Sequence, residues 1–227
     1  MLDFLTLDAK GVAAAIVVGV LILALGQGMG PYFLGVILLF LVLSGLVTWV
    51  GRHRKMAIGV YQKYRSWRNV VANGAMPVLI AGFYYLNSGA GIVPANFIVI
   101  SYVASVAAIT ADKFSSELGV LAGRPMMLLT MKMVRRGTSG AVTAAGVGAG
   151  LLGSLIIGST LLSVIGTLGG LNYGILLVVV IVSGLAGNIT DTVFGYFEEM
   201  GIGNKFTSNF ACSFIGWLIS MPLLLIL

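Results

Sequence analysis

The sequence predicts an all-α integral membrane protein, a bundle of about seven membrane-spanning helices that forms one domain over residues 1–227. Of the residues, 59% are hydrophobic and only 9% are charged, whereas about a quarter of a soluble domain is charged. Several apolar stretches approach or reach the roughly 20 residues that a helix needs to cross a bilayer. They are too long and too uniformly apolar for the strands of a membrane barrel, so helices are expected.

Seven apolar stretches define the expected helices. They cover residues 11–26, 31–50, 74–87, 95–111, 139–165, 171–194 and 208–226. The third stretch is short, and its helix could begin inside the polar segment before it. The first residues are acidic before they are basic, unlike a cleavable signal peptide, so we expect the first helix to be retained. The single cysteine, Cys212, lies in the last stretch and is expected to be a buried thiol.

The 13 basic and 7 acidic residues can all be placed on one side of a membrane. They occur in the N-terminal tail, which includes Asp3, and in segments 52–68, 112–136 and 191–205, while the other three loops and the C-terminus carry none. The positive-inside rule therefore places the N-terminus and the charged loops in the cytoplasm. Solubility at the edges does not require a few carboxylates among so many cations, so we expect a polar site at the cytoplasmic interface.

Small residues recur every four positions in the fifth stretch, at Gly146, Gly150, Ser154 and Gly158. They give one helix face on which a neighbouring backbone can approach closely, and close packing is the preferred interpretation. A groove that admits an isoprenoid or acyl chain is the alternative.

The first of four polar patches covers residues 65–74. On a helix, Arg65, Asn69 and Asn73 would share one face. Asn73 enters an apolar span, where an uncompensated amide is costly, and this favours a functional role. For Arg65 and Arg68, contact with lipid headgroups is an equally good interpretation.

The second patch covers residues 111–119, where Asp112, Ser115 and Ser116 fall on one side of a helix and Glu117 lies about 140° from Asp112. Ionisable groups next to an uncharged span are expensive and usually mark function. Hard oxygen donors of this kind suit Mg²⁺, which takes one or two carboxylates together with substrate phosphates. A salt bridge between Lys113 and Glu117 is the alternative for that pair.

The third patch, residues 135–140, places two hydroxyls between glycines after two arginines. We expect Thr138 and Ser139 at the N-terminus of the following helix, where free N–H groups favour an anion. Arg135 and Arg136 add bidentate geometry for phosphate. A plain capping loop explains the two hydroxyls equally well, and the spacing is not that of a Walker A loop.

In the fourth patch, four residues share a helical stripe at offsets of three, seven and ten: Asn188, Asp191, Gly195 and Glu198. Asp191 still lies within apolar sequence, so a solvated face explains it poorly, and a buried pair with Lys or Arg is the alternative. Glu198 and Glu199 are expected to be solvated at the interface. Lys205 and Asn209 follow in a polar segment that leads into the last span.

The chain resembles a known family at these patches. The matching stretches are RSWRNVVANG (65–74), ADKFSSELG (111–119), RRGTSGAVT (135–143), GNITDTVFG (187–195) and NKFTSNF (204–210). Their order and spacing resemble the integral membrane proteins that include transmembrane protein 19 and the plant phytyl-phosphate kinase. Lys113 and Phe114 depart from the Thr and Trp of that family, and a Lys beside the acid could alter metal affinity or substrate preference.

The resemblance implies a kinase that uses CTP and Mg²⁺ to convert a prenyl monophosphate, of the phytyl or geranylgeranyl type, to the diphosphate. Asp112 and Asp191 would hold the metal, with Glu117 as a third ligand. Four arginines would neutralise phosphates: Arg65, Arg68, Arg135 and Arg136. The remaining residues assigned to nucleotide or substrate are Asn69, Asn73, Ser115, Ser116, Thr138, Ser139, Asn188, Lys205 and Asn209.

Two other functions stay open. A cytidylyltransferase that makes a CDP-lipid would use the same groups and release pyrophosphate. A transporter is the other, although its ionisable groups would be expected near the midplane. The expected partners are the bilayer, a prenyl phosphate and a nucleotide but no nucleic acid, with homo-oligomerisation open, in an archaeal or bacterial cell membrane.

Overall fold

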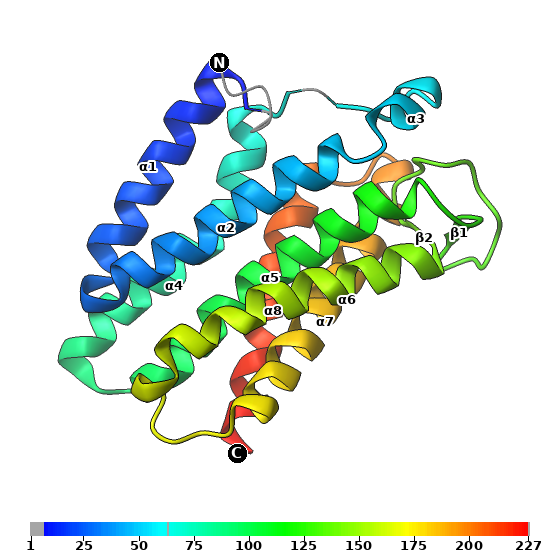
Figure 1. The fold of residues 1–227 in the computed structure, drawn as a ribbon. Helices are drawn as coiled ribbons and strands as arrows, with labels where there is room; N and C mark the ends of the chain where they lie inside the picture. The colour runs from blue at the N-terminus through cyan, green and yellow to red at the C-terminus, as the bar shows by residue number, and fades with distance from the viewer. Residues whose placement is uncertain (1–6, 63, 227) are drawn as a thin grey trace.

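The computed structural model describes residues 7–62 and 64–226, so Asp3 and Lys63 lie outside it (Figure 1). The helices are α1 (Ala9–Leu25), η1 (Gln27–Met29), α2 (Gly30–Trp49), α3 (Arg52–Ala57), α4 (Trp67–Ala90), α5 (Ala95–Gly119), α6 (Ala144–Ser159), η2 (Thr160–Thr167), α7 (Tyr173–Glu199) and α8 (Lys205–Leu225). A two-stranded antiparallel sheet, β1 (Met126–Met127) and β2 (Ala141–Val142), lies between α5 and α6.

The prediction of an all-α, multi-pass membrane protein is confirmed. Within residues 7–62 and 64–226, six helical segments are long and apolar enough to cross a membrane: Gln27–Trp49, Trp67–Ala90, Ala95–Gly119, Ala144–Thr167, Tyr173–Glu199 and Lys205–Leu225. The shorter apolar helix α1, of 17 residues, accounts for the remaining predicted stretch.

Helix α5 forms the centre of the bundle. In its most apolar window 83% of residues are buried, against 33–39% in the other five spans, and it packs on α2, α4, α6, α7 and α8. Contact with the neighbours is close because glycines face it: a Cβ on Gly187 would lie 2.5 Å from the Cβ of Ala108, and one on Gly216 would lie 2.7 Å from it. Cys212 is buried and free, as predicted.

The small-residue face of α6 packs against α5 and α7. A Cβ on Gly146 would lie 3.0 Å from the Ser115 carbonyl, and one on Gly150 would lie 3.1 Å from the Ala111 carbonyl. A Cβ on Gly158 would meet Leu177 at 2.8 Å. The packing interpretation is therefore confirmed, and a lipid groove on this face is wrong because neighbouring helices fill it.

Several helix boundaries differ from the expected spans, including the end of α7, which lies at Glu199 and not at 194. Helix α4 begins at Trp67 and α5 continues to Gly119, because a helix can extend past the last apolar residue into a polar environment. The fifth span begins at Ala144 and not at 139: Gly137 and Gly140 have φ of 87° and 77°, which a helix excludes. Thr143 caps α6 by accepting a hydrogen bond from the Gly146 N–H at 3.0 Å.

Alternating helix directions gather the charges at one end of the bundle. The described charged residues lie where α1, α4, α6 and α8 begin and where α2, α5 and α7 end, and the C-terminus lies at the opposite end (Figure 1). The one-sided charge layout is thus a property of the fold, and the cytoplasmic orientation of that side stays a prediction.

Candidate functional site

A cavity of about 400 Å³ opens at the charged end of the bundle. All four polar patches contribute to it, and of the predicted site residues only Arg68 and Arg135 do not line it. The predicted residues that do are Arg65, Asn69, Asn73, Asp112, Ser115, Ser116, Glu117, Arg136, Thr138, Ser139, Asn188, Asp191, Lys205 and Asn209. Residues from five separate parts of the chain therefore meet in one cavity, although their individual roles stay predictions.

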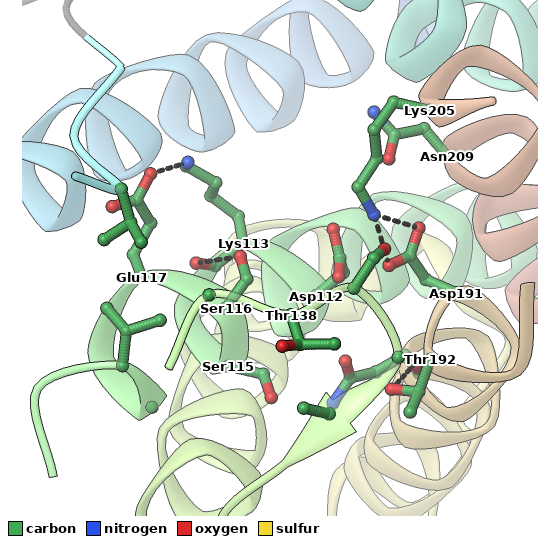
Figure 2. A pocket seen from close by; sticks show the side chains of 18 of the residues that line it. Asp112, Lys113, Ser115, Ser116, Glu117, Thr138, Asp191, Thr192, Lys205 and Asn209 are labelled. Atoms are coloured by element: carbon green, nitrogen blue, oxygen red, sulfur yellow. Dashed lines mark hydrogen bonds and ion pairs between the residues drawn. The ribbon is translucent and has the colours of Figure 1, made fainter. Parts of the chain in front are cut away.

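Two aspartates lie together on one side of the cavity. Asp112 on α5 is within hydrogen-bonding reach of Asp191 on α7, and both carboxyl groups point into the space that Figure 2 shows. Lys205 Nζ lies 2.9 Å from Asp191 Oδ2 and 3.3 Å from Oδ1, and 4.0 Å from Glu198 Oε2. We call Asp112 and Asp191 the aspartate pair. The alternative interpretation of Asp191, a pair with a lysine, is therefore present in the structure.

The first turn of α8 presents Lys205 to the aspartate pair. Asn204 Oδ1 accepts hydrogen bonds from the backbone N–H groups of Phe206 and Thr207 at 2.9 and 3.3 Å. The Thr207 hydroxyl in turn accepts from the Asn204 N–H at 3.0 Å. This reciprocal cap fixes the start of the helix, and hence the position of the Lys205 backbone from which the side chain extends.

Glu117 is surrounded by cations. Lys55 Nζ lies 2.7 Å from Glu117 Oε2, Lys113 Nζ contacts Oε1, and Arg65 Nη2 lies 3.5 Å from Oε1. The Thr48 hydroxyl also donates to Oε1 at 3.0 Å. We call Lys55, Arg65 and Lys113 the basic cluster. It confirms the predicted alternative of a Lys113–Glu117 salt bridge.

The structure does not bring Glu117 to the aspartate pair. Figure 2 shows it apart from Asp112 and Asp191, beside Lys113. Over residues 7–62 and 64–226, no group of three or more Asp, Glu, His or Cys side chains could hold a metal ion. A three-carboxylate site with Glu117 as third ligand is therefore not assembled, because the basic cluster already occupies this carboxylate.

Arg65 points into the protein and not towards lipid headgroups. Its Nη1 donates to the Ser44 hydroxyl at 2.6 Å and its Nη2 to the Thr48 hydroxyl at 2.9 Å. Burial lowers the pKa of this guanidinium, and the carboxylates of Glu117 and Asp112 oppose that shift; arginine stays charged at neutral pH. Arg68, by contrast, is exposed and lies 5.7 Å over the ring of Trp67.

The segment that follows α5 is fastened to the end of α7. The Ser139 N–H donates to Glu199 Oε1 at 2.8 Å, and its hydroxyl donates to Glu198 Oε2 at 3.0 Å. A Cβ on Gly140 would lie 2.5 Å from the Tyr196 nitrogen, so only glycine permits this approach. Glu199 is exposed, as expected, and Glu198 is half-buried; both also accept hydrogen bonds that hold this loop.

The hydroxyls of the third patch do not lie at a helix N-terminus. Thr138 donates to the Arg135 carbonyl at 2.9 Å, within the loop. Arg136 donates to the carbonyls of Val120 and Gly123 at 3.3 and 3.2 Å and lines the cavity, whereas Arg135 is exposed outside it. The capping-loop interpretation is the better of the two for this patch.

The burial of Lys55 was not predicted from the sequence. Its side chain is 1% exposed, and Nζ donates to the Val47 and Thr48 carbonyls at 2.8 and 3.2 Å as well as to Glu117. It thus satisfies the C-terminal carbonyls of α2. Nothing in the basic segment 52–68 distinguishes this lysine from its exposed neighbours, and only the fold of α3 identifies it.

The fold and the cavity define a multi-pass membrane protein with one polar site at one end of its helical bundle. The chain belongs to the family described as integral membrane protein DUF92, which matches residues 2–208. This confirms the family membership predicted from the polar motifs. No solved structure matches the chain significantly.

Three relatives are similar over much of the chain. It is 35% identical over 219 residues to the uncharacterized membrane protein MJ0933 of Methanocaldococcus jannaschii, which covers 95% of this chain and 84% of that protein. It is 29% identical over 171 residues to Protein PGR of Arabidopsis thaliana, with 69% and 57% covered. It is 31% identical over 157 residues to the chloroplastic Protein VTE6 of the same plant, with 67% and 46% covered.

Proposed function

We propose that this protein is a membrane-embedded kinase that transfers the γ-phosphoryl group of CTP to a prenyl monophosphate in the presence of Mg²⁺. The observation that carries the proposal is the convergence, in one cavity at the end of an apolar bundle, of the aspartate pair with Arg65 and Lys113 of the basic cluster. Phosphoryl transfer depends on positioning and on neutralising charge, which such an arrangement supplies. The family resemblance supplies the prenyl phosphate and CTP.

The aspartate pair suits a divalent cation. Two carboxylates in contact repel each other unless a proton or a cation lies between them, and among the described residues Lys205 alone makes an ion pair with them. Asn188 and Asn209 line the same cavity and offer amide oxygens. Asp112 and Asp191 would hold Mg²⁺, which typically takes one or two carboxylates plus phosphates and would neutralise charge on the nucleotide.

The basic cluster suits the acceptor phosphate. Three cations surround one carboxylate there, and Arg65 and Lys113 line the cavity. In the proposed reaction an acceptor phosphate oxygen forms a bond to the γ-phosphorus, and the bond from the γ-phosphorus to the bridging oxygen breaks. CDP leaves with that electron pair. The acceptor oxygen is already anionic at neutral pH, so no general base is required.

The closed far side of the cavity supports an enzyme over a transporter. On α2 and α5 the lining residues farthest from the charged end are Phe40 and Ile109. Beyond them Phe33 stacks on Tyr102 with ring centroids 4.2 Å apart, and the Tyr102 hydroxyl donates to the Phe33 carbonyl at 2.9 Å. This packed layer would have to open for a solute to cross.

The test is product analysis with purified protein in detergent, Mg²⁺, CTP or ATP, and phytyl or geranylgeranyl phosphate. The proposal expects a prenyl diphosphate and CDP in equal amounts. Release of pyrophosphate with a CDP-lipid would replace the kinase by a cytidylyltransferase. Absence of any nucleotide-dependent product with every substrate would overturn both enzymatic assignments.

A further inference from the structure

A second, apolar cavity of about 70 Å³ lies between α1, α2 and α4. Its walls are aliphatic side chains of α1 and α2, and a few polar groups close one end. The apolar lining comprises Leu7, Ala15, Val18, Gly19, Leu34, Ile37, Leu38, Phe40, Leu41, Val70 and Gly74, and the polar lining comprises Ser44, Arg65, Asn69 and Asn73. We call it the α1–α2–α4 groove.

This groove adjoins the polar cavity. Phe40, Arg65, Asn69 and Asn73 line both spaces. Asn73 donates to the Asn69 carbonyl at 3.0 Å, and this hydrogen bond holds its amide at the junction. The Arg65 guanidinium also lines the junction, and its hydrogen bonds to the hydroxyls of Ser44 and Thr48 on α2 hold it in position. A ligand that spans the junction would meet a cation and amides at one end and only hydrocarbon at the other.

We propose that the α1–α2–α4 groove receives the hydrocarbon tail of the lipid phosphate, with the phosphate held at the junction by Arg65, Asn69 and Asn73. This inference rests on the proposed function for the identity of the lipid. A phosphate monoester with an alkyl tail has the required order of charge followed by apolar chain. The α6 face offers no such space, since α5 and α7 fill it.

The size of the groove defines which part of the tail it holds. A volume of about 70 Å³ is small beside the roughly 300–1,000 Å³ of pockets that enclose whole ligands. The groove therefore binds the segment next to the phosphate, and the rest of the tail lies in the bilayer beyond the half-exposed side chain of Leu38 on α2. Burial of even this segment selects for a tail, because each buried methylene contributes to affinity.

Gly19 offers a direct test, because it lines the groove and a Cβ there would lie 3.3 Å from Leu34 Cδ1. The variant Gly19→Phe places a ring in the groove. The expected result is a loss of roughly tenfold or more in kcat/KM for geranylgeranyl phosphate, with little change for dimethylallyl phosphate, which has the same phosphate and a short tail. Val20→Phe is the matched control, since Val20 is 59% exposed and lies outside the groove.

A binding experiment on the wild-type protein needs neither catalysis nor a variant. Geranylgeranyl phosphate with a photoreactive diazirine in its first isoprene units is irradiated with the protein in nanodiscs without nucleotide. The inference expects labelled peptides from α1 around Val18 and from α2 around Leu34 and Leu41, and competition by unlabelled geranylgeranyl phosphate. Labelling elsewhere, or equal competition by geranylgeraniol or bulk phospholipid, would overturn it.

The two proposals fail in different ways. Specific labelling of the groove without any phosphoryl transfer would refute the proposed kinase activity and support the lipid-phosphate groove. If the wild type transfers the phosphoryl group and Gly19→Phe loses activity equally on long and short substrates, the kinase activity is supported and the groove is refuted. If Gly19→Phe does not fold, Ala15→Phe fills the same space from the preceding turn and the labelling experiment still decides.

Discussion

Helix α5 carries two acidic residues, Asp112 and Glu117, into opposite surroundings. Asp112 shares its side of the cavity with a second carboxylate and with one lysine that is 53% exposed. Glu117 faces three cations, of which Lys55 is 1% exposed. The comparison shows that carboxylates five residues apart have different surroundings: two carboxylates share one lysine in the aspartate pair, whereas three cations surround Glu117. In the proposed function, the surplus negative charge of the aspartate pair would attract a cation, and Glu117 would hold the basic cluster in place.

The largest effect on activity is expected at the aspartate pair. Asp112→Asn and Asp191→Asn should each lower kcat by about a hundredfold or more, by analogy with the loss of one preorganised electrostatic partner. Neither variant should unfold the protein, because removing one of two adjacent negative charges relieves repulsion. Turnover and the thermal unfolding midpoint in detergent measure both effects. Wild-type turnover in either variant would refute the metal assignment.

The largest effect on stability is expected at Glu117. Glu117→Gln leaves the buried Lys55 without its carboxylate, and breaking a buried ion pair costs about 3–5 kcal/mol. The unfolding midpoint should therefore fall clearly in Glu117→Gln and not in Asp112→Asn. The double variant Lys55→Met/Glu117→Gln should recover part of the loss, since no unpaired charge remains. If Asp112→Asn destabilises the protein more than Glu117→Gln, the comparison is reversed.

Within the basic cluster, a variant of Lys113 should mainly affect substrate binding, and a variant of Lys55 should mainly affect stability. Lys113 lines the cavity and Lys55 does not. Lys113→Ala should raise KM for the prenyl phosphate by about tenfold, the value of one charge-assisted contact, whereas Lys55→Met should mainly lower the unfolding midpoint. Initial rates over a range of prenyl phosphate concentrations give KM and kcat separately. An unchanged KM in Lys113→Ala would place the acceptor phosphate elsewhere.

The smallest effects are expected at the two predicted arginines that do not line the cavity. Arg68 lies over Trp67, and Arg135 is exposed. Arg68→Ala and Arg135→Ala should each keep kcat/KM within about twofold, as expected for exposed charges. Arg136→Ala, which removes a side chain lining the cavity, is the contrasting variant and should lose more. A larger loss in Arg135→Ala than in Arg136→Ala would show that the loop closes differently around substrate.

The sequence predicted the spans well because hydropathy reports directly which segments can lie in a bilayer. The start of α4 at Trp67 agrees with the expectation that this helix could begin inside the polar segment. The end of α5 was set too early, at residue 111, because hydropathy falls at the first charges, whereas backbone hydrogen bonding continues to Gly119. From the sequence a helix was also expected to begin at Ser139. Gly140 has a left-handed backbone conformation, so this segment is a loop and not a helix. Each error concerns local backbone geometry, which composition does not specify.

The candidate site was predictable where residue type alone carried the argument. Asp112, Asp191 and Asn73 stood out because polar groups beside apolar spans are expensive, and all three line the cavity. The separation of Glu117 from the aspartates was implicit in its angle of about 140° from Asp112 on a helix. The burial of Lys55 and the contact of Ser139 with the end of α7 depend on tertiary packing, so no local sequence pattern predicts them.

The most direct test of the difference between the aspartate pair and Glu117 is binding of Mn²⁺, as a spectroscopic substitute for Mg²⁺, measured by electron paramagnetic resonance on purified protein with CTP present. We predict that Asp112→Asn and Asp191→Asn each weaken binding roughly tenfold or more, while Glu117→Gln, kept below its unfolding midpoint, binds Mn²⁺ like the wild type. Equal loss in Glu117→Gln, or undiminished binding in both aspartate variants, would contradict it.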